Sequence, residues 1–505
     1  MTLTALAELS NESRFLGSGD ANVTSLQADS RAVAPGALFV AMPGMSTDTH
    51  GYLPSAVAAG AVAAIVHSSD GLEFAKSLGL AVIQLPTDKA EFGRAIWRFC
   101  DTFFDHPTRR MKVIGVTGTN GKTTTAWLLR DILTATGLTA GYLGTLGFQI
   151  PGLEAEVENT TPLVVELYNL LAVARDRGVE ALAMEVSSHA LADQRAEGVE
   201  FDAAVFTNLT QDHLDFHGTM EAYELAKWRL FTELPRFSSK SFRAAINADD
   251  PVGARWIEQS EHETVPYSMQ FLTNSKMVRL FPSSIRVDSM DLSPARWSTA
   301  TSEYDRDERA TVRVPLGGNY NHANLTSAFA GALALGFSED AIWSALPHVR
   351  PVPGRFEAVP NTKGFGVLVD YAHTPDALEK LLDAVRPLTS GRIITVFGCG
   401  GDRDKTKRPK MARAASLRSD VTVVTSDNPR TEDPSSILDE VLTGIIPGRE
   451  SVSIVDRKEA VAHAIGLARP GDVVVLAGKG HENYQIIGKS KVPMDDRELA
   501  REALG

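Results

Sequence analysis

The sequence has only two cysteines among its 505 residues, Cys100 and Cys399. Two cysteines so far apart cannot build the disulfide framework of a small secreted domain, and no CxxC pair is present. The N-terminus also lacks the basic start and apolar stretch of a signal peptide. These absences favour a reducing compartment, and we expect a cytoplasmic protein.

Long apolar runs and excess positive charge are lacking as well. Residues 132–153 carry no charged side chain, but Pro151 and several glycines interrupt them, so we expect no membrane insertion. The 50 basic residues are outnumbered by 63 acidic ones, which gives a net charge of −13. Such a balance argues against a protein that binds a nucleic-acid backbone. A polyanionic ligand would need a local positive site.

The chain is too long for a single hydrophobic core, and its length alone suggests about three domains. Short apolar runs alternate with helical segments, which is typical of α/β domains. Buried strands are expected at 113–117, 181–186, 203–208, 244–247, 367–369, 393–397, 421–425 and 473–477. Most of these runs end in polar residues, and open α/β sheets bind ligands at the carboxyl ends of their strands.

The sequence TGTNGKTT at 117–124 follows a predicted strand and precedes a predicted helix. Gly118 and Gly121 allow backbone N–H groups to surround phosphate oxygens, Lys122 can neutralise them, and the Thr123 hydroxyl can bind Mg²⁺. The spacing departs from the common GxxxxGKT pattern because Val116 stands where that pattern has glycine. The loop indicates a nucleoside triphosphate. It leaves open whether the energy forms a bond or drives a conformational switch.

The loop resembles the ATP loop of the Mur ligases and folylpolyglutamate synthetases, and the resemblance covers nearly the whole chain. It continues through EVSSHAL (185–191), TNLTQDHLDFHG (207–218), AKW (226–228), NADD (247–250), NHAN (321–324), VPGRF (352–356), DYAHTP (370–375) and GCGGDRD (398–404). The resemblance implies an α/β protein with the three-domain Mur ligase architecture. The implied domains are a UDP-binding domain (1–110), a central P-loop ATPase domain (111–349) and a C-terminal Rossmann-like, amino-acid-binding domain (350–505).

The resemblance also implies the reaction. ATP converts a carboxylate into an acyl phosphate, which an amine then attacks to form an amide. The implied catalytic residues are Lys122, Glu185, His213 and Lys227. Thr123, Glu185, His213 and Lys227 are the implied Mg²⁺ ligands. A cationic Lys227 would repel Mg²⁺, and in the family CO₂ carbamylates this lysine to an anion. From its helical pattern alone, Lys227 would be an ordinary lysine on a helix surface.

The contacts to ATP follow from the same motifs. The implied residues are Gly118, Thr119, Asn120, Gly121, Lys122, Thr123, Thr124, Asn247, Asn321, Asn324, Arg355 and Asp370. Tyr320 and His322 depart from the usual family wording around Asn321, which leaves the adenine contacts open.

The N-terminal motifs DSR (29–31), GALFVAMPG (36–44) and DTHG (48–51) resemble those of the family members that add the third peptide residue. The implied acceptor is UDP-N-acetylmuramoyl-L-alanyl-D-glutamate. Its implied contacts are Ser30, Asn159, Thr160, Thr161, Ser187 and Arg195. A folylpolyglutamate synthetase would not be expected to carry this N-terminal module.

The incoming amine is indicated by DNPR at 427–430. In the resembling subfamily this sequence accompanies meso-diaminopimelate, whose second amino-acid head offers a carboxylate to an arginine and an ammonium to a carboxylate. The implied contacts are Arg403, Asp427, Asn428, Arg430, Gly478 and Glu482. L-Lysine is the alternative amine. We expect a monomer that acts on these small molecules.

Overall fold

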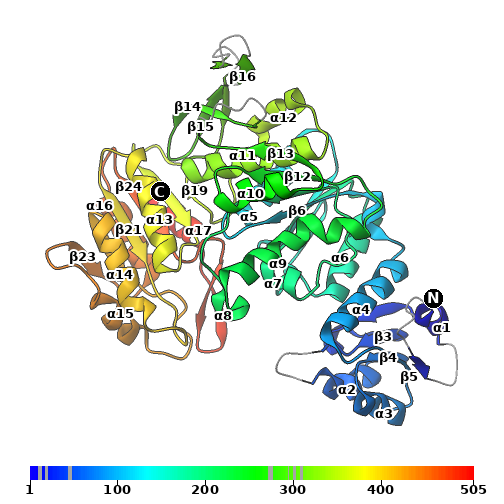
Figure 1. Cartoon of the computed structure of the whole chain (residues 1–505). Helices are drawn as coiled ribbons and strands as arrows, with labels where there is room; N and C mark the ends of the chain where they lie inside the picture. The colour runs from blue at the N-terminus through cyan, green and yellow to red at the C-terminus, as the bar shows by residue number, and fades with distance from the viewer. Residues whose placement is uncertain are drawn as a thin grey trace. The chain divides into compact units, whose positions relative to one another are not determined.

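The computed structural model describes residues 1–8, 14–16, 21–43, 48–270, 277–293, 295–298, 303–306 and 311–505 (Figure 1). Gly44, the last residue of the second N-terminal motif, lies outside these ranges. The described chain separates into two compact units. The first consists mainly of Met1–Gln270 and Ser327–Glu339, and the second mainly of Arg279–Thr326 and Asp340–Gly505.

A five-stranded sheet occupies the N-terminal part of the first unit, in the order β1-β5-β4-β3-β2, and only β1 runs antiparallel to its neighbour. The strands are β1 (Arg14–Leu16), β2 (Ser25–Gln27), β3 (Ala37–Val40), β4 (Ala63–Val66) and β5 (Ala81–Gln84). The helices are α1 (Leu3–Ala7), α2 (Leu53–Ala58), α3 (Ser69–Ser77) and α4 (Lys89–Phe103), with 3₁₀ turns η1 (Ser30–Ala32), η2 (Thr49–Tyr52) and η3 (Pro107–Arg110). Its core includes Val164, Val165 and Tyr168 from the following region, so the two regions pack together.

The central sheet has eight strands in the order β13-β12-β11-β6-β10-β7-β8-β9. The strands are β6 (Lys112–Thr117), β7 (Ala140–Gly144), β8 (Gly147–Ile150), β9 (Leu153–Ala155), β10 (Ala181–Glu185), β11 (Ala203–Phe206), β12 (Arg243–Asn247) and β13 (Glu263–Tyr267). All pairings from β13 to β7 are parallel, whereas β8 and β9 form an antiparallel edge. The carboxyl ends of β6, β10 and β11 therefore meet at one edge.

Helices cover both faces of this sheet, as expected for buried parallel strands. The helices of this region are α5 (Lys122–Ala135), α6 (Val164–Asp176), α7 (Ser188–Ala192), α8 (Leu214–His217), α9 (Met220–Thr232), α10 (Pro251–Gln259) and α11 (Asn319–Ala334), with the 3₁₀ turn η4 (Leu234–Phe237). Leu171 of α6, Phe231 of α9 and Trp256 of α10 share one core with alternate strand residues. On the other face, Gly331 of α11 approaches Ile114, Val205 and Leu129, the last from α5.

The second unit contains a six-stranded sheet in the order β19-β20-β24-β21-β22-β23, parallel except for β19. The strands are β19 (Glu357–Ala358), β20 (Gly366–Asp370), β21 (Ile393–Phe397), β22 (Val421–Val424), β23 (Glu450–Ser453) and β24 (Val473–Ala477). The helices are α12 (Glu339–Ala345), α13 (Pro375–Val385), α14 (Lys407–Arg418), α15 (Pro434–Leu442), α16 (Arg457–Leu467) and α17 (Asp496–Leu504), with 3₁₀ turns η6 (Leu346–His348) and η7 (Arg386–Leu388). Smaller sheets contain β14 (Phe281–Ile285), β15 (Met290–Ser293) and β18 (Val312–Val314), β16 (Ala295–Ser298) and β17 (Glu303–Arg306), and β25 (Tyr484–Ile487) and β26 (Ser490–Pro493).

The sequence specifies several helix starts directly. Asp250, Thr374 and Asp433 accept backbone N–H groups at the starts of α10, α13 and α15, and a proline follows each of them. Side-chain caps satisfy N–H groups that have no partner within the helix, and proline fits the first helical position.

The predicted α/β class is confirmed, and every predicted buried strand corresponds to an observed one within a few residues. The domain limits 1–110, 111–349 and 350–505 remain a prediction. Among the helices in the described ranges, none has the length and apolar character needed to cross a membrane.

Candidate functional site

The phosphate loop lies between β6 and α5, as the sequence predicts. Gly118 and Gly121 have φ values of +144° and +86°, a region that glycine adopts readily. The Lys122 ammonium donates hydrogen bonds to the carbonyl oxygens of Gly118 (3.0 Å) and Thr119 (2.8 Å). It therefore folds over the loop, where it would meet a bound phosphate.

Glu185 ends β10, which lies beside β6, and its side chain is fully buried. The Thr123 hydroxyl donates to Oε2 (2.9 Å), while the Tyr142 hydroxyl (2.5 Å) and the Thr145 N–H (2.8 Å) donate to Oε1. A carboxylate and a hydroxyl oxygen this close are the hard donors that Mg²⁺ prefers. The sequence did not point to Tyr142 or Thr145, since neither belongs to a recognised motif.

His213 immediately precedes α8 with a φ of +51° and is partly buried. Burial lowers the pKa of His213; Asp212 opposes this shift, and Lys122 and Lys227 add to it. The neutral imidazole, which can bind a metal, is therefore the favoured form.

Lys227 lies on α9 but is only 1% exposed, so it is not a surface lysine. Its ammonium donates to the Gly118 carbonyl (2.8 Å) and lies 4.4 Å from the centre of the Tyr223 ring. Burial, followed by the charge of Lys122, lowers the pKa of Lys227 well below its ordinary value. The structure thus brings Lys122, Glu185 and Lys227 to the same loop.

Several predicted acceptor contacts lie around Glu185. The Thr161 hydroxyl donates to the Glu185 carbonyl (2.9 Å) and accepts from the Ser187 N–H (3.1 Å). The Arg195 guanidinium donates to the Thr161 carbonyl (3.3 Å), and the Thr160 and Thr145 hydroxyls lie 3.1 Å apart.

Among the described residues, the side chains of Ser30 and Asn159 make no hydrogen bond to that cluster, although Asn159 directly precedes Thr160. Ser30 begins η1, and the guanidinium of the next residue, Arg31, lies 3.7 Å from the carboxylate of Glu158, which precedes Asn159. Among the side chains that the structure describes, Ser30 and Asn159 make no hydrogen bond to each other; only their neighbours Arg31 and Glu158 approach.

The remaining predicted ATP contacts are divided between the units. Asn247 ends β12 in the first unit and donates to the Thr207 carbonyl (2.7 Å). In the second unit, Asp370 accepts from the N–H groups of Phe356 (2.7 Å) and Ala372 (2.8 Å), and burial raises its pKa. The others in that unit are Asn321 and Asn324 on α11 and Arg355, whose guanidinium lies over the Tyr371 ring. Joint binding of ATP by the two groups stays a prediction.

The predicted amine contacts gather at the carboxyl ends of β22 and β24. Asn428 donates from Nδ2 to Glu482 Oε2 (2.9 Å), and Gly478 directly follows β24 with a φ of +110°. Arg430 has a φ of +53° and donates to the Gly401 carbonyl (2.8 Å). Arg403 is exposed, and both arginines approach Gly400.

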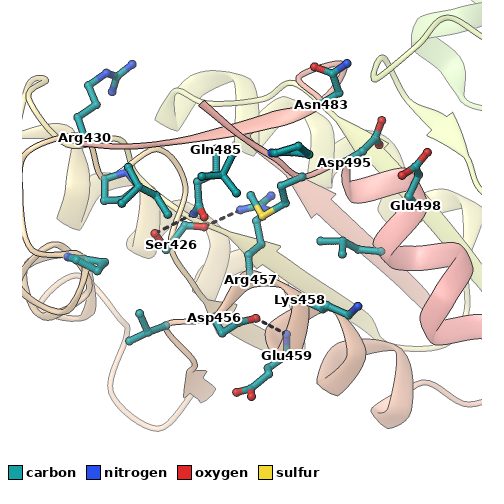
Figure 2. Close-up of a pocket in the computed structure, with 18 of the residues that line it drawn as sticks. Ser426, Arg430, Asp456, Arg457, Lys458, Glu459, Asn483, Gln485, Asp495 and Glu498 are labelled. Atoms are coloured by element: carbon teal, nitrogen blue, oxygen red, sulfur yellow. Dashed lines mark hydrogen bonds between the residues drawn. The ribbon is translucent and has the colours of Figure 1, made fainter. Parts of the chain in front are cut away.

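A cavity of about 980 Å³ borders the same loop, with Ser426 and Arg430 in its lining (Figure 2). It is not the predicted amine pocket, because Asp427, Asn428 and Glu482 do not line it. Figure 2 shows Arg430 directed away from Asp456 and Glu459, which line the opposite end.

Within the described ranges, one group of three His, Cys, Asp or Glu side chains is close enough to hold a metal ion: Asp48, His50 and His67. Asp48 Oδ1 already accepts from the backbone N–H of His50 (3.0 Å) and lies 2.6 Å from its Nδ1. Asp48 also caps η2. These hydrogen bonds explain the closeness of Asp48 and His50 by the local turn, and we assign no metal to the cluster.

The chain is similar to known proteins along most of its length. Three family descriptions match the chain: "Mur ligase family, catalytic domain" at residues 22–95, "Mur ligase middle domain" at 116–332 and "Mur ligase, glutamate ligase domain" at 354–480. UDP-N-acetylmuramoyl-L-alanyl-D-glutamate–2,6-diaminopimelate ligase of Gloeobacter violaceus is 45% identical over 96% of this chain and 94% of that protein. The protein of the same name from Geobacillus thermodenitrificans is 42% identical over 96% of each chain.

Solved structures show the same fold. A UDP-N-acetylmuramoyl-L-alanyl-D-glutamate–2,6-diaminopimelate ligase matches with a TM-score of 0.65 and 32% identity, covering 95% of this chain and 94% of that one. The MurF ligase of Thermotoga maritima in complex with ADP matches with a TM-score of 0.60 at 18% identity, covering 96% and 98%. The second likeness concerns the fold alone.

Proposed function

Because the chain belongs to the Mur ligase family, we propose that it uses ATP to join meso-2,6-diaminopimelate to the D-glutamate carboxylate of UDP-N-acetylmuramoyl-L-alanyl-D-glutamate. The names of the relatives support this substrate pair. The observation that carries the proposal is the phosphate loop with Lys122 folded over it, beside Glu185 and the threonines expected to contact the acceptor.

The proposed reaction has two steps. The acceptor carboxylate attacks the γ-phosphorus of ATP, which gives an acyl phosphate and ADP. The amine of diaminopimelate then attacks the acyl carbon, releases inorganic phosphate and loses a proton as the amide forms. Lys122 stabilises the negative charge on the phosphoryl oxygens in the first step.

Mg²⁺ fits the residues at the loop. The Glu185 carboxylate and the Thr123 hydroxyl, 2.9 Å apart, would hold one ion. His213 and Glu185, supported by a carbamylated Lys227, would hold a second. When bound, the ions supply positive charge to the phosphate oxygens. Tyr142 and Thr145 keep the Glu185 carboxylate in place.

The experiment that tests the function is an amine screen. Phosphate release is measured with ATP and the UDP-linked dipeptide in the presence of meso-diaminopimelate, L-lysine or L-glutamate. We expect release to require both the dipeptide and diaminopimelate. Phosphate release from ATP in the absence of both the dipeptide and an amine would indicate an NTP-driven switch. Release in the presence of the dipeptide and L-lysine, but not with the dipeptide and diaminopimelate, would indicate the lysine-adding alternative.

Lys227 is proposed to carry a carbamate in the working enzyme. Carbamylation joins a neutral amine to CO₂ and releases one proton, and burial favours the neutral amine. Lys227→Ala is expected to lower kcat by about 10²-fold, as for the loss of a group that supports a metal ligand. Steady-state assays with and without added short-chain carboxylates provide the measurement.

The matched control is Lys112→Ala, which removes an exposed lysine from the start of β6. Partial recovery of the Lys227→Ala variant by acetate or formate would support the carbamate. Full activity of Lys227→Ala in the presence of bicarbonate would rule it out.

The cellular setting completes the proposal. We propose a cytoplasmic monomer with three domains (1–110, 111–349 and 350–505) that acts on small molecules and binds no nucleic acid. Sedimentation at assay concentration tests the monomer, and a larger particle would contradict it.

A further inference from the structure

Lys479 is a fully buried lysine in the loop that follows β24. Its ammonium contacts three side chains: Asn428 Oδ1 (3.1 Å), Glu482 Oε2 (3.0 Å) and Asp427 Oδ1 (3.4 Å). The two carboxylate side chains are only 11% and 19% exposed. A buried ammonium is tolerated only where it is paired and hydrogen-bonded, and Lys479 meets both conditions.

The contacts of Lys479 fix the orientation of Asn428. Asn428 Oδ1 accepts from both Lys479 and the backbone N–H of Ile486 in β25 (2.9 Å). Its Nδ2 must then point the other way, and it donates to Glu482 Oε2 (2.9 Å). Lys479 and Asn428 therefore both donate hydrogen bonds to Oε2 of Glu482.

The carboxylates of Asp427 and Glu482 each have a second oxygen that Lys479 does not contact. Glu482 Oε1 and Asp427 Oδ2 accept no hydrogen bond from the residues that the structure describes. Two carboxylates against one lysine also leave one uncompensated negative charge among these three side chains. One further ammonium would satisfy both the free oxygens and the charge.

We propose that Lys479 is a positioning residue for the incoming amine: it holds Asp427, Asn428 and Glu482 so that the free oxygens of the two carboxylates receive the ammonium of the amino-acid head of diaminopimelate. The inference rests on the proposed function, since it concerns the same substrate. Lys479 itself does not touch the substrate. It acts as an internal ammonium that occupies one oxygen of each carboxylate and leaves the other oxygen for the ligand.

The test separates this role from general support of the fold. Lys479→Met removes the charge and its donors, and Lys479→Gln keeps an amide donor without the charge. KM and kcat are measured separately for ATP, the UDP-linked dipeptide and diaminopimelate. Lys458→Met is the matched control, because Lys458 is an exposed lysine of the same unit that pairs with Glu502.

We expect Lys479→Met to raise KM for diaminopimelate roughly 30-fold, the lower range for breaking one partner of a buried charged pair. KM for the dipeptide should change less than about threefold, because its predicted contacts lie in the other unit. KM for ATP should rise less than KM for diaminopimelate, because the phosphate loop also lies in that unit. Lys479→Gln should give a smaller rise in KM for diaminopimelate, and Lys458→Met should leave all three constants unchanged.

The outcomes distinguish the inference from the proposed function. A wild-type protein that cannot use diaminopimelate refutes the function itself. A wild-type protein that uses it, together with Lys479 variants that keep its KM or lose all three substrates equally, overturns the inference alone. Failure of both variants to fold, seen by circular dichroism and thermal unfolding, would assign Lys479 to the fold and would also overturn it.

Discussion

Lys122→Ala is expected to lower kcat for amide formation by about 10³-fold, close to 4 kcal/mol of transition-state stabilisation. The Lys122 ammonium lies over the phosphate loop and is held by the Gly118 and Thr119 carbonyls. Phosphoryl transfer depends on preorganised positive charge at the transferred oxygens, and alanine supplies none. Coupled assays of ADP release with saturating substrates measure the change.

The loop backbone should survive this substitution, because other residues secure it. Asn208 accepts from Asn120 N–H (3.0 Å), and Thr207 donates to the Asn120 carbonyl (2.7 Å). We therefore expect little change in the thermal unfolding midpoint, with Lys112→Ala as the control for a lost lysine at the opposite end of β6. Near wild-type kcat in Lys122→Ala would remove the loop from the mechanism.

The sequence was sufficient to predict the local structure of the phosphate site. The apolar strand, the glycines and the following helix all obey short-range rules, and the structure places β6, Gly118 and α5 accordingly. The order of the strands in the sheet could not be predicted from such short-range rules. β10 lies between β6 and β7 although it follows both in the sequence, and such order depends on long-range pairing.

The burial of charged side chains in the site could not be predicted from sequence patterns. Lys227 has the spacing of a helix-surface lysine, yet the Gly118 carbonyl and the Tyr223 ring enclose it. Lys479, in a glycine-rich loop, would be expected in solvent, but Asp427 comes from a distant segment and pairs with it, together with Glu482 three residues further along the loop. Long-range contacts decide both cases.

The supports of Glu185 were missed for a related reason. Tyr142 and Thr145 lie in an uncharged stretch that the sequence describes only as turns and a strand. They reach Glu185 because β7 pairs with β10 in parallel register. Only the sheet pairing makes these residues neighbours of a predicted metal ligand.

Diaminopimelate is expected to be preferred over L-lysine by about 10⁴-fold in kcat/KM, because a site built around a polar group rejects an analogue that leaves the group unpaired. The unpaired group would be Arg430. Its backbone is fixed by hydrogen bonds to β25 and the following turn, Arg430 N–H to the Ile486 carbonyl (3.0 Å) and Gly488 N–H to the Arg430 carbonyl (2.7 Å). The guanidinium is therefore presented from a rigid segment.

Arg430→Ala should lower kcat/KM for diaminopimelate by about 10³-fold, the range expected when one partner of a buried charged pair is removed. Lysine has no second carboxylate, so its kcat/KM should change less than about fivefold. Arg430→Lys keeps the charge but loses the planar fork, and an intermediate loss is expected. Arg413→Ala, an exposed arginine on α14, serves as the control. Steady-state assays with both amines decide the matter: similar wild-type rates for the two amines, or equal losses in Arg430→Ala, would mean that another residue selects the amine.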